Sequence, residues 1–304
     1  MKKLLSYIAI VILGTALLDG IYRIFCYQAY HNPSDNSYIY NINKYIYYDQ
    51  PADLAILGAS RANHHYAIKL IEDSLNIVAY NWGGDGQSIL LQYLALLKAN
   101  ENGKLKIVIL DLGNGQIGDW VKSHISSLYP YYWENDTIKN LVDEVEGMNM
   151  SPFMISSFVQ YNSKINDIAK SHKRKMELDK GYSPIPYTGK PFIRDKGQEV
   201  VSKNEKNKEL NSTGIKYLKR MASMCQQKGI RFIVCISPIL SSYEKKQVTK
   251  TIKTCSDNGI ECWDMKDVIK DPYLFKDDTH LNAKGAELFT EMLIRKLQKT
   301  NAIE

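Results

Sequence analysis

The sequence predicts an α/β fold in which a parallel sheet carries helices on both faces. Short apolar runs at residues 53–57, 76–80 and 106–112 alternate with helical segments, and further runs follow at 231–236 and 260–263. Strands that alternate with helices form parallel sheets, and continuous apolar strands are typical of sheets covered on both faces. With 304 residues the chain has room for one large domain with additions, or for two small domains.

The first residues predict a membrane segment. Two lysines precede an apolar run from Leu4 to Leu18, and this order favours an N-terminus that stays in the cytoplasm. The run is shorter than the ~20 residues of a usual span, and Asp19 and Arg23 interrupt its extension. We expect residues 1–26 to be an uncleaved anchor, with a cleaved signal peptide as the competing interpretation. The anchor predicts a single-pass cell-membrane protein with its main domain on the extracytoplasmic side, in the periplasm or at the cell exterior.

The remaining chain divides into a linker and one decorated domain. Residues 27–50 are polar and tyrosine-rich and are expected to be a linker. Residues 51–304 carry the alternating strands and helices. The stretch 115–210 interrupts this alternation, is polar and partly helical, and is expected to be an insertion or lid.

The helices between the strands follow from apolar periodicity. Residues 62–75 and 88–99 have the pattern of helices that pack against the sheet. Residues 283–297 are expected to form the closing helix, for which Asn282 is the expected N-cap. Gly58 ends the first apolar run and permits a tight turn there.

Charge and cysteine usage narrow the possible partners. The formal charge of +6 is spread along the chain, and no basic block is interleaved with aromatic residues. This pattern does not favour nucleic-acid binding. The five cysteines match no zinc motif, so we expect buried thiols. The sequence does not decide whether two of them form a disulfide.

Polar residues follow the expected strands at the points where the strands end. Ser60, Gly86, Asn114 and Ser237 all occupy such positions. Because the carboxyl ends of parallel strands meet at one edge of a sheet, these residues are expected to share a pocket.

Ser60, His280 and Asp277 are the residues with catalytic chemistry. A serine is a poor nucleophile unless a base takes its proton, and histidine is such a base when a carboxylate holds its other ring nitrogen. The three-residue offset in the Asp277-Asp278-Thr279-His280 turn lets the carboxylate reach back to the imidazole. The competing structural interpretation makes Ser60 a helix N-cap and the turn a solvated acidic loop.

An oxyanion requires donors that are fixed in advance. The backbone amides of Ser60 and Gly86 are candidates, and Asn114 offers a side-chain amide; each is otherwise a turn residue. His64 and His65 are adjacent and therefore do not face the same way on a helix, so we expect surface or supporting roles for them rather than metal binding.

These residues resemble the SGNH (GDSL-like) hydrolase superfamily. Gly58-Ala59-Ser60 corresponds to the Gly-Asp-Ser nucleophile motif of the family. The family's oxyanion glycine lies five residues after an asparagine, and Asn81 and Gly86 match this pair. Asp277-x-x-His280 corresponds to the terminal motif. The resemblance covers residues 53–112 and 230–298. It implies a flavodoxin-like three-layer α/β/α sandwich and the activity of an esterase, a lipase or a carbohydrate O-acetyl hydrolase or transferase.

Two motifs depart from the family pattern. Ala59 replaces the usual aspartate but leaves the serine in place. The third-strand motif, usually Gly-x-Asn-Asp, reads Leu112-Gly113-Asn114-Gly115-Gln116, with a shifted register and no second acid. The shifted register concerns Asn114, the expected side-chain donor to the oxyanion.

The sequence thus predicts a serine-dependent ester hydrolase or O-acyltransferase of the cell envelope. By family analogy its acyl-ester substrate is carried on cell-surface polysaccharide, and no metal or organic cofactor is implied. The alternative from another class is a catalytically inactive family member that binds glycan or partner proteins. A lipase acting on membrane lipid near its own anchor is a third interpretation.

Overall fold

The structure is a computed structural model that describes residues 2–31, 42–47, 49–118, 121, 125–161, 168, 179–193 and 210–300. The chain divides into two compact units. The smaller comprises residues 1–44 and 124–176, and the larger comprises residues 45–123 and 177–304.

The larger unit contains a five-stranded sheet in the order β2-β1-β3-β4-β5, with every pair parallel. The strands are β1 (Leu54–Gly58), β2 (Ala79–Asn81), β3 (Ile107–Asp111), β4 (Arg231–Ile236) and β5 (Cys262–Asp264). This is the flavodoxin-like strand order, and the sites of such sheets lie outside the carboxyl ends of the strands. The predicted α/β fold is therefore confirmed.

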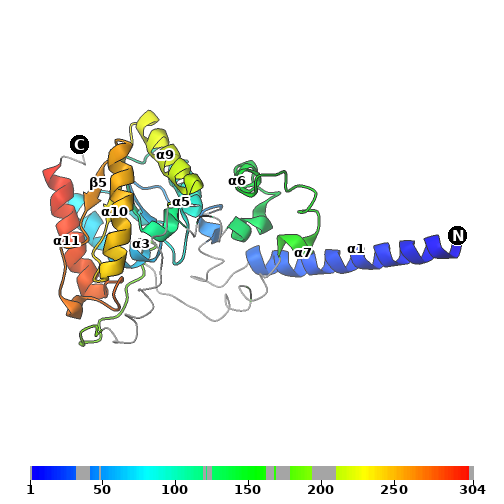
Figure 1. Ribbon diagram of the computed structural model, residues 1–304, viewed down its shortest axis with the longest axis horizontal. Coiled ribbons are helices and arrows are strands. Elements are labelled where there is room, and N and C mark those ends of the chain that lie inside the picture. Colours follow the sequence, from blue (N-terminus) through cyan, green and yellow to red (C-terminus); the bar gives the residue numbers. More distant parts are fainter. Residues whose placement is uncertain are drawn as a thin grey trace. The chain divides into compact units, whose positions relative to one another are not determined.

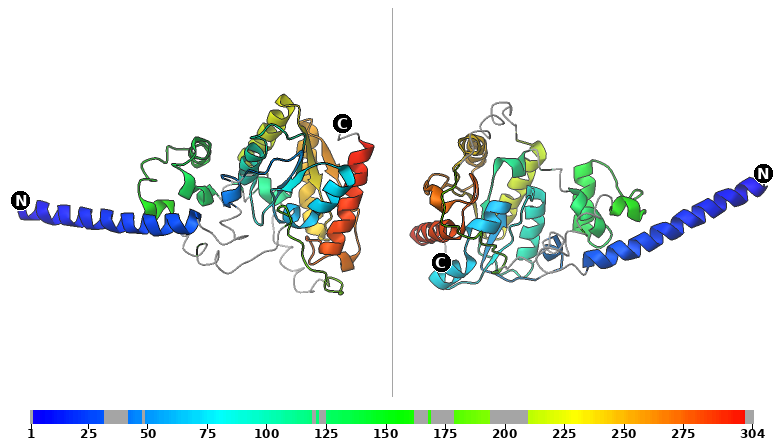
Figure 2. Two further views of the ribbon diagram at one scale, coloured as in Figure 1. Left: turned by 180° about the vertical axis from the view of Figure 1, so that it is seen from behind. Right: turned by 90° about the horizontal axis from the view of Figure 1, so that it is seen from below.

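Helices cover both faces of this sheet (Figures 1 and 2). One face carries α3 (Ser60–His65), α4 (Ile68–Leu75) and α11 (Ala283–Lys299), and the other carries α5 (Ile89–Ala99) and α9 (Ser212–Gln227). The helix α10 (Ser242–Asp257) contacts β5 and the 3₁₀ turn η1 (Asn114–Ile117). Continuous apolar strands suit this burial on both faces; β1 and β3 are buried at every position.

The helix predicted over residues 62–75 is broken at Tyr66. Tyr66 has extended backbone angles, φ −118° and ψ 99°, and separates α3 from α4. Its ring is fully buried, and its hydroxyl donates a hydrogen bond of 2.8 Å to Asp111 Oδ2 at the end of β3. The break thus allows a large side chain to reach the edge of the sheet.

The smaller unit is built on the N-terminal helix α1 (Lys2–His31). The other elements are the 3₁₀ helix η2 (Ile125–Tyr131), α6 (Asp136–Glu146) and the single turn α7 (Ser157–Gln160). The ring of Tyr30 lies 5.9 Å from Tyr131 and 5.5 Å from Tyr161. Because Tyr30 is buried in this aromatic cluster, α1 continues through the first five residues of the segment expected to be a linker.

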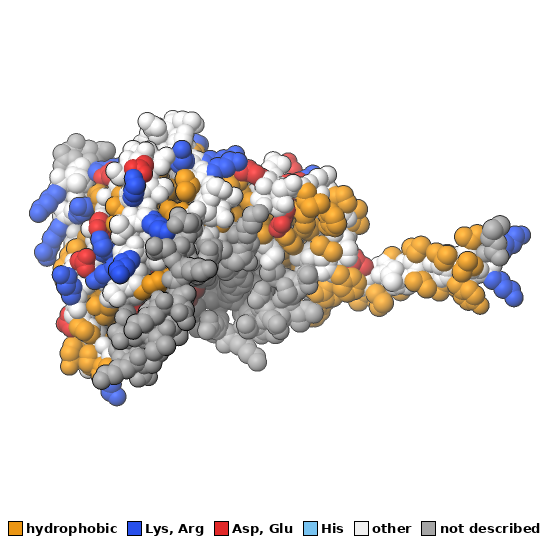
Figure 3. All heavy atoms as spheres, viewed as in Figure 1, with side chains coloured by type: hydrophobic (Ala, Val, Ile, Leu, Met, Phe, Trp, Pro, Cys, Tyr) orange, Lys and Arg blue, Asp and Glu red, His pale blue; other side chains and the backbone are white. Residues whose placement is uncertain are grey.

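The helix α1 is long and apolar enough to cross a membrane, and no part of its most apolar stretch is buried. In Figure 3 the helix is covered with apolar side chains and ends in basic ones. These properties are shared by a membrane anchor and by a signal sequence.

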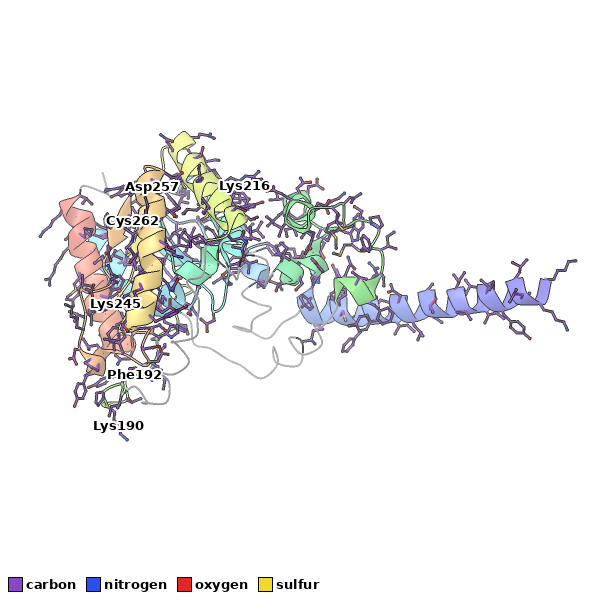
Figure 4. All side chains as sticks on the ribbon, in the orientation of Figure 1. Lys190, Phe192, Lys216, Lys245, Asp257 and Cys262 are labelled. Carbon is purple, nitrogen blue, oxygen red and sulfur yellow. The ribbon has the colours of Figure 1, made fainter. Side chains whose placement is uncertain are left out.

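All five cysteines are free thiols. Cys225, Cys235 and Cys255 are buried, as expected, and Cys262 (labelled in Figure 4) is partly exposed on β5. The disulfide that the sequence left open is not formed.

Candidate active site

The turn between β1 and α3 presents Ser60. Gly58 has φ +143°, and a Cβ at this position would lie 2.6 Å from the carbonyl oxygen of Asp111 and 2.7 Å from the Cβ of Ala62. Only glycine fits such a backbone and such a close approach. Ala59 is the N-cap of α3 and Ser60 its first residue, so the Ser60 side chain does not cap the helix.

His280 lies within hydrogen-bond distance of both Ser60 and Asp277. Ser60 Oγ is 2.7 Å from His280 Nε2, and His280 Nδ1 is 2.9 Å from Asp277 Oδ2. An ionised carboxylate can only accept a hydrogen bond, so the proton lies on Nδ1 and Nε2 can accept the proton of the serine hydroxyl. This arrangement satisfies the geometric requirement for a nucleophile and its base.

The loop that carries His280 is fixed by its own hydrogen bonds. Asp277 Oδ1 accepts the backbone amides of Thr279 and His280, both at 2.9 Å. Asn282 caps α11 by accepting the Gly285 amide at 3.2 Å, which confirms the predicted cap. The Asp278 carbonyl accepts two amides from the segment after β4, which ties the loop to the end of that strand.

The Asp277 carboxyl has an unusually low pKa. Burial alone raises this pKa, but the hydrogen bond and positive charge of His280, with the two amides, lower it to about 2 from 3.8. Because the side chain is 43% exposed, solvent screens part of this interaction. Asp277 is therefore ionised wherever the protein is folded near neutral pH.

A stability test follows from this low pKa. A carboxyl whose pKa is lower in the folded state contributes stability that is fully present above its unfolded pKa of 3.8 and is lost as the pH falls to about 2. We expect the unfolding midpoint in urea, followed in mild detergent, to fall over this window in the wild type and to fall less in Asp277→Asn. Equal falls in both proteins would contradict the assigned pKa.

His65 holds the loop that carries His280 in place through a hydrogen bond. Its Nε2 accepts the Leu281 amide at 2.9 Å, so Nδ1 carries the proton and donates to Ser237 Oγ at 2.9 Å. The ring is fully buried, and burial lowers its pKa well below 6.5. His65 is thus a neutral link between α3, the end of β4 and the residue that follows His280. Ser237, which was expected at a strand end, accepts the hydrogen bond that holds the His65 ring.

His64 and Asp85 join α3 to the loop that contains Gly86. His64 Nδ1 donates to the Ser183 carbonyl at 2.6 Å, and Nε2 lies 3.1 Å from Asp85 Oδ1. Because carbonyls and carboxylates only accept, this arrangement favours the cationic form of His64, in which both ring nitrogens are protonated. Burial lowers the pKa of His64, but the hydrogen bond and charge of Asp85 outweigh burial and raise it. The rings of His64 and His280 are 5.9 Å apart.

We expect Asp85→Asn to lower kcat/KM for an acyl ester by between roughly tenfold and a hundredfold, because the Gly86 loop loses its fixed position. The raised pKa of His64 gives the sign of the pH dependence. The wild type holds the ion pair at low pH and loses it as the pH rises through that pKa, so the two proteins should converge at alkaline pH.

The matched control for this prediction is Asp73→Asn. Asp73 forms an exposed i,i+4 pair with Lys69 on α4, and such pairs contribute little. A gap between wild type and Asp85→Asn that widened with rising pH would contradict the assignment of His64 as a cation.

Of the additional oxyanion donors expected from the sequence, the structure describes the Gly86 amide but not the Asn114 side chain. Gly86 has φ +69°, and its amide donates no hydrogen bond to any residue that the structure describes. Asn81 fixes the preceding turn by accepting the Gly83 amide at 2.8 Å and donating to the Ala62 carbonyl at 2.7 Å. Asn114 begins η1 after β3, but its side chain lies outside the described part of the structure.

Arg61 forms a salt bridge. Its Nη2 lies 2.8 Å from Asp111 Oδ1, and Asp111 also accepts the Tyr66 hydroxyl. The Asp111 side chain is fully buried, and burying a charge requires such partners. Arg61 thus balances a buried carboxylate at the sheet edge.

Part of the predicted insertion packs beside the site. We call residues 179–193 the strap (Lys190 and Phe192 are labelled in Figure 4). The Ser183 amide donates to the Asn63 carbonyl at 2.9 Å, and the Ile185 carbonyl accepts the Ala283 amide at 2.7 Å. The strap therefore contacts both α3 and the start of α11. A Cβ on Gly181 would lie 1.9 Å from the Asn81 carbonyl oxygen, so glycine is required where the strap meets β2.

Sequence reasoning missed three of these supporting features. In the sequence, nothing marks Asp85 except its place beside Gly86. The roles of His65 and of the strap depend on hydrogen bonds across 216 and 119 positions of sequence, which no local pattern reports. Within the described ranges no group of three or more His, Cys, Asp or Glu side chains is arranged to hold a metal ion.

Comparisons with known proteins give the following similarities. A protein-family model matches residues 194–301, less than half of the chain, and names no activity. No curated protein matches the chain. Among solved structures, a lipase/acylhydrolase from Enterococcus faecalis is 10% identical with a TM-score of 0.42, covering 81% of this chain and 96% of its own.

Two acetyl xylan esterases are also similar. One is 11% identical with a TM-score of 0.39, covering 80% of this chain and 99% of its own. The other, from the rumen bacterium Butyrivibrio proteoclasticus, is 10% identical with a TM-score of 0.36, covering 83% of this chain and 64% of its own. At these identities the activity of this chain has to be argued from its own residues. The strand order and the helices on both faces of the parallel sheet give the chain a flavodoxin-like α/β fold.

Proposed function

We propose that this protein is a serine-dependent hydrolase of acyl esters, or an O-acyltransferase, with Ser60 as the nucleophile. The observation that carries the proposal is the 2.7 Å contact of Ser60 Oγ with His280 Nε2, on an imidazole whose Nδ1 is held by Asp277. A serine hydroxyl within hydrogen-bond distance of a histidine base has the arrangement that acyl transfer requires.

The first half of the reaction forms an acyl-enzyme. Ser60 Oγ attacks the ester carbonyl carbon while its proton passes to His280 Nε2, and Asp277 stabilises the imidazolium that results. The carbonyl oxygen becomes an oxyanion, for which the Ser60 and Gly86 amides are the proposed donors, with the Asn114 side chain as a third. The intermediate then collapses, and the leaving alcohol takes the proton from His280.

The second half decides between hydrolysis and transfer. His280 deprotonates either water or a sugar hydroxyl, the new oxygen attacks the acyl carbon, and Ser60 leaves with the proton returned by His280. Water yields a carboxylic acid, whereas a sugar yields a new ester. Both outcomes use the same residues and neither needs a redox partner.

We further propose that α1 anchors the enzyme in the cell membrane with its larger unit outside the cytoplasm. Two lysines precede the apolar stretch of α1, and positive residues stay on the cytoplasmic side. An enzyme in that position meets polysaccharide of the cell surface, so an acyl group on such a polysaccharide is the proposed substrate class.

The proposed activity is tested with p-nitrophenyl acetate and the full chain in detergent. We expect release of p-nitrophenol that is saturable in substrate and absent from Ser60→Ala. Adding an oligosaccharide then separates the two reactions: a transferase forms acetylated sugar at the expense of acetate, and a hydrolase releases the same acetate as before. Turnover that is equal in wild type and Ser60→Ala would refute the assignment.

The alternative is an inactive SGNH-like protein that binds glycan or an envelope partner. It is motivated by the third-strand motif, where Gly115 stands in place of the acid that usually follows the asparagine. A fluorophosphonate probe separates the alternatives, because it labels an activated serine covalently. An intact, folded protein that stays unlabelled would favour the binding protein.

A further inference from the structure

The part of α1 that precedes its first acidic residue, Asp19, is shorter than a usual membrane span. Leu4 to Leu18 comprises 15 residues, which rise about 22 Å as a helix. The hydrocarbon layer is about 30 Å thick and needs about 20 residues. A span that starts at Leu4 therefore reaches the turn between Asp19 and Arg23, where the helix carries two charges.

Another segment of the same unit satisfies both charges. We call residues 153–158 the membrane-side loop. The Asp19 carboxylate accepts the Ser157 amide and the Ser156 hydroxyl, each at 2.8 Å. The Arg23 guanidinium lies 3.6 Å from Asp19 and donates to the Ile155 carbonyl. Ionisable groups near hydrocarbon are costly unless they are paired in this way.

The outer surface of this loop is apolar. Phe153, Ile155 and Phe158 are 47%, 69% and 53% exposed. Phe158 also stacks on Tyr22 of α1, with ring centroids 4.8 Å apart. No residue between positions 147 and 161 is charged. Soluble surfaces seldom expose apolar side chains together in this way without a partner.

Apolar side chains of α1 itself and of a neighbouring segment are exposed as well. Ile21, Ile24 and Phe25 are exposed on the helix beyond Asp19. Trp133 is also exposed, and its indole donates to the Met154 carbonyl at 3.0 Å. Tryptophan with one polar and one apolar end is typical of the boundary between membrane and water.

We propose that the membrane-side loop lies in the lipid at the outer boundary of the bilayer, where it covers Asp19 and Arg23 and completes the span of α1. This inference rests on the proposed anchoring role of α1. Lipid is the occupant because the loop packs against a helix with the length and composition of a span, and because the loop carries no charge that a protein partner would pair. The partly buried polar contacts with Asp19 hold the backbone of the loop, and its most exposed side chains are apolar.

The test places a fluorescent amino acid by amber suppression at Ile155 in the full chain, reconstituted into nanodiscs of phosphatidylcholine and phosphatidylglycerol with brominated acyl chains. Val11, exposed in the middle of α1, is the positive control, and Asn140, exposed on α6, is the negative control. We expect bromine to quench the probes at Val11 and Ile155 and to leave the probe at Asn140 unquenched.

The controls separate this inference from the anchor. Quenching at Val11 without quenching at Ile155 would overturn the loop proposal and leave the anchor intact, whereas no quenching at either position would overturn both. A probe at Ile155 that is shielded from water but not quenched by bromine would indicate a protein partner and would also overturn the proposal.

A variant tests whether Asp19 holds the loop in place. Asp19→Asn removes the negative charge of the group that accepts hydrogen bonds from Ser156 and Ser157, and it keeps the length of the side chain. We expect it to reduce quenching at Ile155 while quenching at Val11 is kept. Unchanged quenching at Ile155 would contradict the role assigned to Asp19.

Discussion

Replacing Ser60 by alanine is expected to lower kcat for p-nitrophenyl acetate by a factor on the order of 10³ or more, because no other group near His280 replaces the lost nucleophile. The fold should survive, since Ser60 does not cap α3 and its hydroxyl contacts only the His280 ring among the described side chains. The measurement is steady-state turnover, with circular dichroism as the check on folding.

Ser74→Ala is the matched control for this loss. Ser74 lies exposed on α4, so the same substitution there should leave kcat unchanged. A loss shared by both variants would indicate general damage, and retained turnover in a folded Ser60→Ala protein would exclude Ser60 as the nucleophile.

Gly58→Ala is expected to be the most destabilising small substitution in the catalytic turn. The added Cβ would meet the Asp111 carbonyl oxygen at 2.6 Å and the Ala62 side chain at 2.7 Å, at a φ of +143°. Backbone strain and overpacking each cost about 1–3 kcal/mol. We therefore expect a loss of about 4 kcal/mol and a fall in the melting temperature of about 10 °C.

Gly103→Ala separates the steric part of this effect from the conformational part. Gly103 also has a positive φ, +64°, but a Cβ there would meet nothing within 4 Å. It should lower the melting temperature by only a few degrees, about what backbone strain alone costs. Thermal unfolding in mild detergent measures both variants, and equal effects would show that crowding at Gly58 does not matter.

The sheet was predictable because its signals are local. β1, β3 and β4 are unbroken apolar runs, and the structure places each within one residue of the predicted bounds. The short strand β2 begins three residues later than predicted, because Asn76 ends α4 in a left-handed conformation and residues 77 and 78 complete the turn. The helix break at Tyr66 was not predictable, since it depends on the distant Asp111.

In the candidate site, too, the compact motifs were predictable from the sequence and the long-range contacts were not. Ser60 and the Asp277-x-x-His280 turn were visible because each motif is compact, and Asn282 followed from ordinary helix capping. The supports were invisible because they are long-range contacts between groups that are unremarkable in sequence. His65 looks like any histidine until Leu281 is placed on its ring nitrogen.

The N-terminal segment shows a similar limit. Asp19 and Arg23 counted against a membrane span when only α1 was considered, because a charge in an apolar run is costly. Their partners, Ser156, Ser157 and Ile155, lie more than 130 positions away. No periodicity in α1 indicates them.

The central claim is that His280 activates the Ser60 hydroxyl, and the rate of covalent labelling by a fluorophosphonate tests it most directly. The adduct is located on Ser60 by peptide mass spectrometry in wild type, in His280→Gln and in His31→Gln, a histidine of the smaller unit. We predict rapid labelling of Ser60 in wild type and His31→Gln, and loss of labelling in His280→Gln although the serine is still present. Equal labelling rates in wild type and folded His280→Gln would contradict the claim.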